Sequence, residues 1–239
     1  MIIKLIRHGE SIANAGEIPQ NSMPDSQISL SQVGIGQARN VGKIIGSDFL
    51  SKSLIYTSPY LRTRQTTACI LDGSGLCGRY ESNHSLRKWY EDPRLREVER
   101  GYNKNESLME EEEKAREQEG WFYYRFAGGE SPADCYDRIT AFTESMMRQV
   151  ARKRLSRIVI VSHGLTIRCF IMRWMHLTVE QFNLLRNPKN CDIITITSKN
   201  SLKIPQFVNG KYGVIGLNLT PRNNPEIASK THFLPTTLQ

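Results

Sequence analysis

Short, mainly apolar runs recur along the chain, and each is followed by a turn and then by apolar residues at helical spacing. Ile2 to Ile6 forms the first run, Leu54 to Tyr56 the second and Ile158 to Val161 the third. Runs of this length, bounded by turn residues, are typical of strands that are buried on both faces. Strand and helix patterns that alternate in this way predict an α/β fold with a mostly parallel sheet.

Four segments have the spacing and the start signals of helices. Ser31 is a favoured N-cap residue, and Ser131 followed by Pro132 begins a long apolar stripe. The predicted helices are the segment after Ser31, residues 62–71, the segment after Ser131 and residues 165–175. Residues 148–157 contain five basic and no acidic residues, which suits the negative end of the third helix. We interpret this basic cluster as a solvated helix end.

The remaining chain has a weaker pattern. Residues 72–129 contain glycines, charged residues and aromatic residues without a clear strand, so we interpret them as an insertion or cap over the sheet. Further on, Asp192 to Thr197 predicts a strand and Asn209-Gly210 a hairpin turn. We expect one domain over residues 1–239, a three-layer αβα sandwich with a mostly parallel central sheet, an inserted cap at 72–129 and a loosely ordered tail at 221–239.

The composition is that of a globular protein and bears on the compartment in which we expect it. The 239 residues are 39% hydrophobic, and the first apolar run is too short for a signal sequence or a membrane span. The five cysteines are odd in number and contain no CxxC pair, so they predict neither a disulfide framework nor a zinc site. We therefore expect a cytoplasmic protein. A homo-oligomer is left open by these features.

The net charge of +8 bears on the choice of partner. A basic chain suits nucleic acid or anionic lipid, but it suits equally an enzyme whose substrate carries phosphate. The charge is also patterned, because residues 104–119 hold seven glutamates against three basic residues. Composition alone does not distinguish between these partners, so the candidate catalytic residues have to be considered.

Two of the predicted strands end in the same way. The first runs into Arg7-His8-Gly9 and the third into Ser162-His163-Gly164. Parallel strands bring their carboxyl ends to one edge of the sheet, where ligands bind in open α/β folds. Arg62 follows the turn after the second strand and should reach the same edge. The sequence therefore predicts a crevice that contains two histidines and at least two arginines.

This grouping matches the requirements of phosphoryl transfer. Guanidinium groups fit the oxygens of a phosphate and stabilise the charge that spreads over them in the transition state. A neutral imidazole is a competent nucleophile, and a phosphohistidine intermediate divides one difficult displacement into two easier ones. We therefore predict His8 as the nucleophile, a small phosphorylated molecule as the substrate, no metal, and no nucleic-acid or membrane partner.

Several motifs, in a fixed order, resemble those of the histidine phosphatase superfamily, which includes the cofactor-dependent phosphoglycerate mutases. The motifs are Leu5-Ile6-Arg7-His8-Gly9-Glu10-Ser11 with Asn14, Leu30 to Gly34, Tyr56 to Arg62, Leu95-Arg96-Glu97, Gly129-Glu130-Ser131 and Val161 to Gly164. The resemblance covers roughly Ile2 to Leu185 and is greatest to a phosphoglycerate-mutase-like branch. It implies the same three-layer fold and phosphatase or mutase activity.

The resemblance also implies roles for individual residues. His8 would accept the phosphoryl group, and His163, as a second catalytic residue, would bind that group. Glu97 would be the general acid or base, since a carboxyl group can protonate a leaving alkoxide and later activate water. The phosphate would be bound by Arg7, Asn14, Arg62 and Gly164. The resemblance requires no metal ion and, for a phosphatase, no cofactor.

One departure from the mutase pattern separates the alternatives. The mutases carry Glu-Arg-His-Tyr-Gly where this chain has Glu97-Val98-Glu99-Arg100-Gly101, without the His-Tyr pair. A mutase must exclude water while the phosphohistidine waits for its acceptor. We therefore favour hydrolysis of phosphomonoesters, with a phosphoglycerate mutase-type phosphotransferase and a non-catalytic phosphate-binding protein as alternatives.

Two further patterns have structural interpretations. Gly34 and Gly36 lie inside a predicted helix, where glycine costs about 1 kcal/mol relative to alanine, so we expect close packing there. The aromatic residues of the segment 121–126 suit either a platform for bases or substrate, or a patch that packs an insertion onto the domain.

Overall fold

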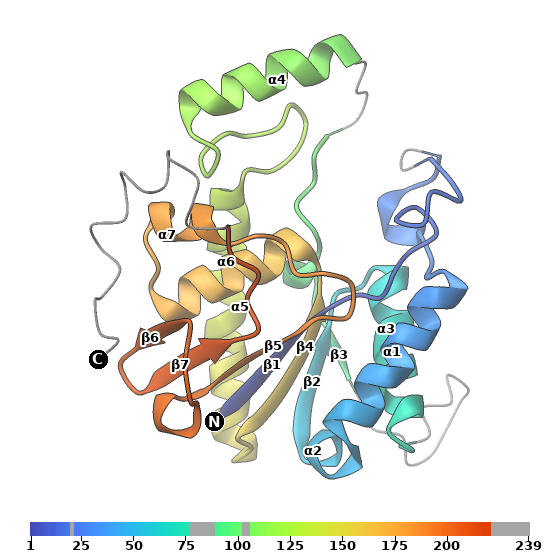
Figure 1. The fold of residues 1–239 in the computed structure, drawn as a ribbon, viewed down its shortest axis with the longest axis vertical. Helices are drawn as coiled ribbons and strands as arrows, with labels where there is room; N and C mark the ends of the chain where they lie inside the picture. The colour runs from blue at the N-terminus through green and yellow to red at the C-terminus, as the bar shows by residue number, and fades with distance from the viewer. Residues whose placement is uncertain (20–21, 77–88, 102–105, 221–239) are drawn as a thin grey trace.

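The computed structural model describes residues 1–19, 22–76, 89–101 and 106–220 (Figure 1). Within these residues a seven-stranded sheet forms the centre of the molecule, in the order β3-β2-β4-β1-β5-β7-β6. The strands are β1 (Ile2–Arg7), β2 (Ser53–Thr57), β3 (Tyr90–Glu91), β4 (Arg157–Ser162), β5 (Ile193–Ser198), β6 (Phe207–Asn209) and β7 (Tyr212–Ile215).

The central strands of the sheet are parallel, as the sequence predicted. β4 pairs in parallel with both β1 and β2, and β2 pairs in parallel with the short β3. On the other side β5 pairs with β1 in the antiparallel sense, and β7 and β6 extend this half of the sheet. In the register of β1 and β4, Arg7 lies opposite Ser162, so His8 and His163 leave the sheet side by side.

Helices cover both faces of the sheet. One layer contains α1 (Gln32–Ile45), α2 (Ser47–Ser51) and α3 (Leu61–Gly73), and the other contains α5 (Pro132–Lys153), α6 (Gly164–Met175) and α7 (Val179–Leu184). Figure 1 shows α4 (Glu106–Glu119) beyond the end of the sheet toward which β1 runs. The 3-10 helices are η1 (Asp25–Gln27), η2 (Pro93–Leu95) and η3 (Lys199–Ser201). The predicted three-layer αβα arrangement is confirmed.

Alternation of side chains along the strands produces the two halves of the core. Ile3 and Leu5 of β1 face a cluster that includes Phe142 of α5 and Phe170 of α6. Ile6, on the opposite face, belongs to a second cluster with residues of α1 and α3. Because both faces of each central strand are covered, these strands are apolar almost throughout, which is the pattern expected of parallel sheets.

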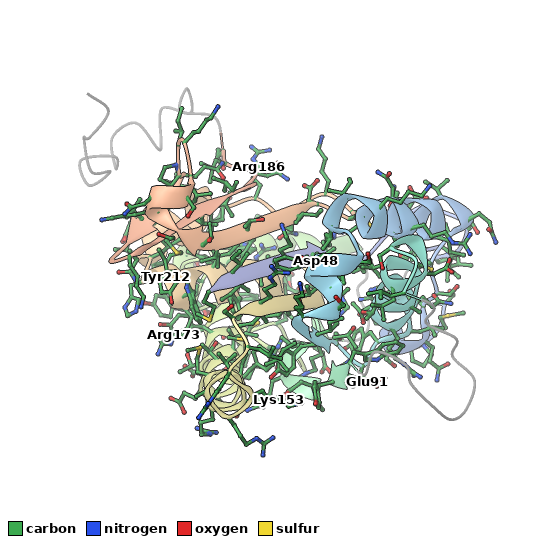
Figure 2. All side chains as sticks on the ribbon, turned by 90° about the horizontal axis from the view of Figure 1, so that it is seen from below. Asp48, Glu91, Lys153, Arg173, Arg186 and Tyr212 are labelled. Atoms are coloured by element: carbon green, nitrogen blue, oxygen red, sulfur yellow. The ribbon has the colours of Figure 1, made fainter. Side chains whose placement is uncertain are left out.

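Polar groups lie outside these layers. Asp48, Lys153 and Arg186, which Figure 2 labels in a view from below, are examples of exposed charged side chains. The basic cluster at the end of α5 is part of this solvated surface, as the sequence predicted, with Arg152 and Lys153 in the last helical turn. In the described part of the chain, no helix is both long and apolar enough to cross a membrane.

The predicted helix starts have the expected caps. The Ser31 side chain accepts a hydrogen bond from the Gly34 amide at the beginning of α1. At the beginning of α5, Ser131 and Asp134 form a reciprocal capping box, and Pro132 occupies the first turn. The local signals in the sequence therefore determine where these two helices begin.

The structure corrects parts of the sequence interpretation. Residues 72–129 do contain a strand, β3, which pairs with β2; with only two residues it has no periodicity to detect. The hairpin turn lies at Gly210-Lys211, one residue later than predicted. The predicted loose tail at 221–239, and residues 77–88 and 102–105 of the predicted cap, lie outside the described residues.

The structure tests the predictions made for the aromatic segment 121–126 and for Gly34 and Gly36. Phe122, Tyr124 and Phe126 are buried in the core cluster below α5 and α6, so the packing interpretation is correct for them. Gly34 packs closely, because a Cβ atom there would lie 2.0 Å from the Glu10 carbonyl oxygen. For Gly36 the expectation of close packing is wrong, since no atom lies within 4 Å of the corresponding position.

Candidate active site

The carboxyl ends of β1 and β4 bring two histidines into contact. The His8 amide donates a hydrogen bond to the Ser162 carbonyl at 3.0 Å, which continues the parallel pairing beyond the strands. The imidazole rings of His8 and His163 then meet edge to face, with centroids 5.3 Å apart. Only 4% of His8 and 0% of His163 is exposed. The parallel register thus places both rings at the predicted edge.

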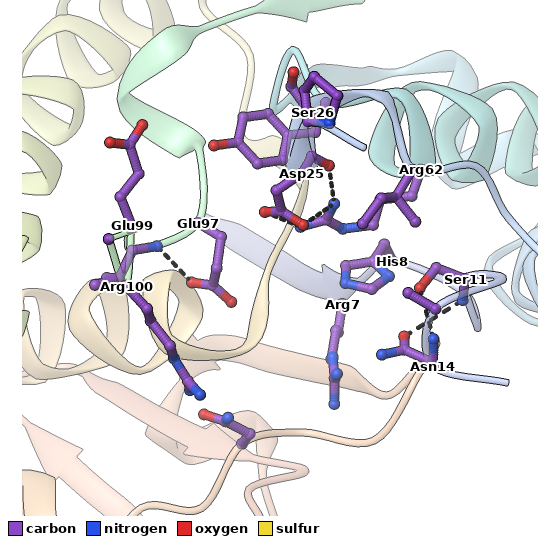
Figure 3. Close-up of a pocket in the computed structure, with 17 residues that line it drawn as sticks. Arg7, His8, Ser11, Asn14, Asp25, Ser26, Arg62, Glu97, Glu99 and Arg100 are labelled. Atoms are coloured by element: carbon purple, nitrogen blue, oxygen red, sulfur yellow. Dashed lines mark hydrogen bonds and ion pairs between the residues drawn. The ribbon is translucent and has the colours of Figure 1, made fainter. Parts of the chain in front are cut away.

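A cavity of about 480 Å³ opens in front of His8 (Figure 3). Five of the residues predicted from the sequence line it, namely Arg7, His8, Asn14, Arg62 and Glu97. They come from the end of β1, the loop that follows it, the first turn of α3 and the segment after η2. The structure therefore collects groups from widely separated parts of the chain around one space.

The His8 ring has a defined tautomer. Its Nδ1 lies 2.7 Å from the Gly9 carbonyl oxygen, which can only accept a hydrogen bond. Nδ1 therefore carries a proton, and in the neutral ring the lone pair is on Nε2. Burial lowers the pKa of His8 well below its ordinary value, and the charges of Arg62 and Arg7 lower it further against the effect of the Gly9 hydrogen bond.

His163 lies behind His8 and does not line the cavity itself. Its Nε2 is 2.8 Å from the Ser58 hydroxyl oxygen, and its ring packs edge to face on Tyr60 at 5.0 Å. Burial is the main cause that lowers the pKa of His163 well below its ordinary value, followed by the charge of Arg62. Both imidazoles are therefore neutral at physiological pH.

Two arginines next to the histidines differ in their partners. Arg7 donates from Nη1 to the Pro188 carbonyl at 2.7 Å, while its buried Nε has no hydrogen-bond partner among the described residues. Burial lowers the pKa of Arg7, although guanidinium remains charged in proteins. Arg62 pairs with the carboxylate of Asp25 and lies over the Tyr60 ring, 5.0 Å from its centre.

Glu97 lies at the N-terminus of α6. Its Oε1 accepts hydrogen bonds from the Thr166 amide at 3.2 Å and the Thr166 hydroxyl at 3.1 Å, and Oε2 accepts one from the Leu165 amide at 3.3 Å. The Val98 amide also donates to Oε1, at 3.0 Å. Free amides at a helix N-terminus favour a negative group, so this helix end fixes the carboxyl group at the cavity wall.

The segment that carries Glu97 is tied to the core on both sides. The Ser162 hydroxyl donates to the Leu95 carbonyl at 2.8 Å, and the Thr166 hydroxyl contacts the Arg96 carbonyl at 2.6 Å. Glu130, before α5, forms ion pairs with Arg96 and with Arg138, the latter at 3.0 Å. These contacts give the segment a defined position although it has little regular secondary structure.

Asn14 and Gly164 have different positions relative to the cavity. Asn14 lines it, and its side-chain oxygen accepts hydrogen bonds from the Ser11 amide and the Asn190 side chain, both at 3.3 Å. Gly164 is buried at the start of α6, outside the lining, where a Cβ would lie 2.9 Å from the Asn187 side chain. A side chain at position 164 would therefore push against the cavity wall.

Other lining residues were not anticipated from the sequence. They include Asp25, Tyr60, Arg100 and Asn187. Tyr60 lies within the motif Tyr56 to Arg62 and Arg100 within the segment 97–101, so these motifs already contained a signal for both. Asp25 and Asn187 lie in irregular segments whose periodicity and spacing carry no sign of the cavity.

Comparison with known proteins agrees with this geometry. Residues 3–209 match the family model described as histidine phosphatase superfamily, branch 1. The chain belongs to this family. Its resemblance to the family therefore extends well beyond the short motifs, over most of the sequence.

Individual relatives carry phosphatase or mutase names. "Phosphoglycerate mutase-like protein AT74" of Arabidopsis thaliana is 38% identical over 80% of this chain, which spans only 63% of that relative's length. "Broad-range acid phosphatase DET1" of Saccharomyces cerevisiae is 27% identical, covering 84% of this chain and 86% of that protein. The structure of the α-ribazole phosphatase from Shigella flexneri superposes with a TM-score of 0.65 at 23% identity, over 91% of this chain and 96% of the other. The chain thus shares the family and fold of phosphatase- and mutase-type enzymes.

Proposed function

We propose that this chain is a metal-independent phosphomonoesterase that works through a phosphohistidine intermediate on His8. The tautomer of His8 is the observation that carries the proposal. Because Nδ1 donates to the Gly9 carbonyl, Nε2 holds the lone pair in a cavity that Arg7 and Arg62 also line. A neutral imidazole beside two guanidinium groups combines a nucleophile with the positive charge that a phosphoryl dianion needs.

The proposed reaction has two displacements. In the first, Nε2 of His8 attacks phosphorus, the bond from phosphorus to the ester oxygen breaks, and the leaving oxygen takes a proton from the Glu97 carboxyl group. In the second, water attacks the phosphohistidine while Glu97 takes its proton; the phosphorus–nitrogen bond breaks and inorganic phosphate leaves. Arg7 and Arg62 hold the phosphoryl oxygens in both steps, and the neutral His163 ring supports the His8 ring from behind.

The cavity wall favours hydrolysis over transfer. Residues 97–101 line the cavity without the His-Tyr pair of the mutases, and Asp25 and Glu99 add carboxylates to the same wall. A mutase has to exclude water while it holds the phosphohistidine for a second acceptor, and a wall without that pair is less suited to this task. The name of the yeast relative, a broad-range acid phosphatase, supports the same choice.

The central experiment measures hydrolysis of p-nitrophenyl phosphate in the presence of a chelator. We expect the wild-type chain to retain its activity, and His8→Ala to lose it by at least about a thousandfold, since no other group can replace the nucleophile. His176→Asn is the matched control, because His176 is exposed at the end of α6 and outside the cavity lining. Residual activity in His8→Ala, or loss of activity with the chelator alone, would contradict the proposal.

A second measurement separates hydrolysis from mutase activity. Product analysis with 3-phosphoglycerate should show inorganic phosphate, with no fast isomerisation when 2,3-bisphosphoglycerate is added. Rapid acid-free quenching during turnover of a labelled substrate should trap label on the wild-type chain and none on His8→Ala. Isomerisation faster than phosphate release would replace the phosphatase with the phosphotransferase alternative.

A further inference from the structure

Asp25 forms one side of the cavity by pairing with the end of the Arg62 guanidinium. Nη1 and Nη2 of Arg62 donate to the two carboxylate oxygens of Asp25, each at 3.0 Å. Nη1 also donates to the main-chain carbonyl oxygen of Asp25 at 2.6 Å. Figure 3 shows this pair next to the His8 ring, with Asp25 on the side of Arg62 that faces Glu97.

The two partners differ in their surroundings. The Arg62 side chain is only 6% exposed and rests on the Tyr60 ring, whereas Asp25, in η1, is 44% exposed. Tyr60 limits movement of the guanidinium out of its plane, and the bidentate pair limits rotation within the plane. A carboxylate that pairs with a guanidinium at two points in one plane fixes the orientation of the guanidinium as well as attracting it.

Two N–H groups of Arg62 remain available to a ligand. A guanidinium has five N–H groups, of which Asp25 uses both on Nη1 and one on Nη2. The remaining two are the Nε–H and the second N–H of Nη2, which point the same way from the other edge. Within the described residues, no hydrogen bond uses this Nε–Nη2 edge. Two parallel donors match two oxygens of a phosphoryl group.

We propose that Asp25 is a positioning residue, which fixes Arg62 so that its Nε–Nη2 edge receives the phosphoryl oxygens of the substrate. This role rests on the phosphatase function proposed above. Asp25 does not touch the reacting atoms; it acts through Arg62. A carboxylate in an anion-binding cavity would otherwise weaken substrate binding, and its pairing with the far edge of Arg62 explains why it is compatible with the chemistry.

The test uses Asp25→Ala in the full chain, with p-nitrophenyl phosphate as substrate and inorganic phosphate as inhibitor. We expect kcat/KM to fall about 10- to 100-fold, because a misplaced guanidinium no longer meets the transition state. Phosphate should inhibit the variant about tenfold more weakly. Asp25→Glu restores the carboxylate and should recover part of both losses. Asp25→Asn, which preserves the shape, takes the place of Asp25→Ala if the latter does not fold, with the same expected direction.

A double-mutant cycle with Arg62→Lys tests whether Asp25 acts on catalysis through Arg62. Lysine has no two-point edge, so Asp25→Ala should cause less than about a threefold further change in that background. Asp72→Ala is the matched control, since it removes a carboxylate that pairs with Arg39 at 2.9 Å on the surface. It should leave kcat/KM and the inhibition constant of phosphate unchanged.

Three results would overturn the inference: stronger inhibition of Asp25→Ala by phosphate, no change in either constant, or equal losses in the two backgrounds. Stronger inhibition would mean that Asp25 competes with the substrate for Arg62. These outcomes are separate from a failure of the proposed function, which would appear as activity that survives in His8→Ala.

Discussion

At the scale of single residues, His8 and the His163 ring behind it are neutral at a pH where histidine in water is partly charged. Burial, followed by the charge of Arg62, holds the pKa of both His8 and His163 well below the ordinary value of 6.5. An uncharged ring preserves the lone pair that the proposed nucleophile needs. The same burial makes protonation of these rings unfavourable for the folded state.

Stability should therefore decrease on the acid side. As the pH falls through 6.5, the unfolded chain takes up protons on these histidines and the folded chain does not, so the free energy of unfolding falls. Between pH 7.5 and 5.0, His8→Ala should lose about 1 to 2 kcal/mol less stability than the wild type. Urea unfolding in phosphate-free buffer at the two pH values measures this difference. Equal losses in both proteins would show that His8 is protonated in the folded chain.

The role of Glu97 can be tested through the leaving group. A general acid matters most when the leaving oxygen is strongly basic, so Glu97→Gln should lower kcat/KM for an alkyl phosphate about 100-fold or more, and for p-nitrophenyl phosphate far less. Glu99→Gln is the companion variant, because Glu99 also lines the cavity but, within the described residues, forms its side-chain ion pair with Arg96 and not a hydrogen bond with α6. If the loss that depends on the leaving group occurred in Glu99→Gln instead, the acid would have been misassigned.

Residue chemistry also explains which parts of the site could be predicted. His8, Arg62 and His163 directly follow strands or turns that the apolar pattern reveals, so their meeting at one edge follows from a parallel register. Asp25 is 37 residues from Arg62 along the chain, in a segment without periodicity. Its contact depends on how the loop after β1 folds back, and local sequence contains no rule for that.

At the scale of elements, the loop after β1 packs directly on α1 through two glycines. A Cβ on Gly9 would lie 2.6 Å from the Gly34 carbonyl oxygen, and one on Gly34 would lie 2.0 Å from that of Glu10. Such close backbone approach fixes the residues next to His8 against a capped helix. The glycine pattern in the sequence predicted a contact of this kind, but only the structure shows which glycine makes it.

The two helix glycines should respond to alanine in opposite ways. Gly34→Ala should reduce the free energy of unfolding by about 1 to 3 kcal/mol or more, because backbone atoms have to move. Gly36→Ala should raise it by about 0.5 to 1 kcal/mol, because the position is open and alanine favours the helix. Thermal or urea unfolding of both variants measures the effect. A Gly34→Ala variant as stable as the wild type would mean that the loop after His8 moves at little cost in free energy.

The elements themselves were predictable to the extent that they are long and have clear ends. β1, β2, β4 and the helices α1, α3, α5 and α6 follow from apolar runs and caps. β3 could not be found, because two residues give no period, and the antiparallel order of β5, β7 and β6 depends on long-range pairing. The shift of the hairpin turn by one residue reflects the geometry of the turn, which the dipeptide signal alone does not determine.

At the scale of the whole molecule, the cavity is lined by the end of β1, the first turn of α3 and loops that come from distant parts of the chain. A ligand that binds there should stabilise the entire fold, since the unfolded chain has no such site. Inorganic phosphate at 100 times its dissociation constant should add about 2.7 kcal/mol and raise Tm by roughly 5 °C. Arg62→Ala should remove most of this shift. Calorimetric melts with and without phosphate test it; a shift that persists in Arg62→Ala would indicate binding elsewhere.

The position of β1 in the sheet has a consequence for the order in which the chain can assemble. β1 precedes the other strands of this sheet along the chain, yet it lies between β4 and β5, which come from much later parts of the sequence. The earliest segment must therefore wait for distant partners, and contacts so far apart along the chain slow folding. A growing polypeptide could not bring the proposed catalytic residues together before β4 and the start of α6 had emerged from the ribosome, so a partly made chain should be unable to carry out the proposed hydrolysis.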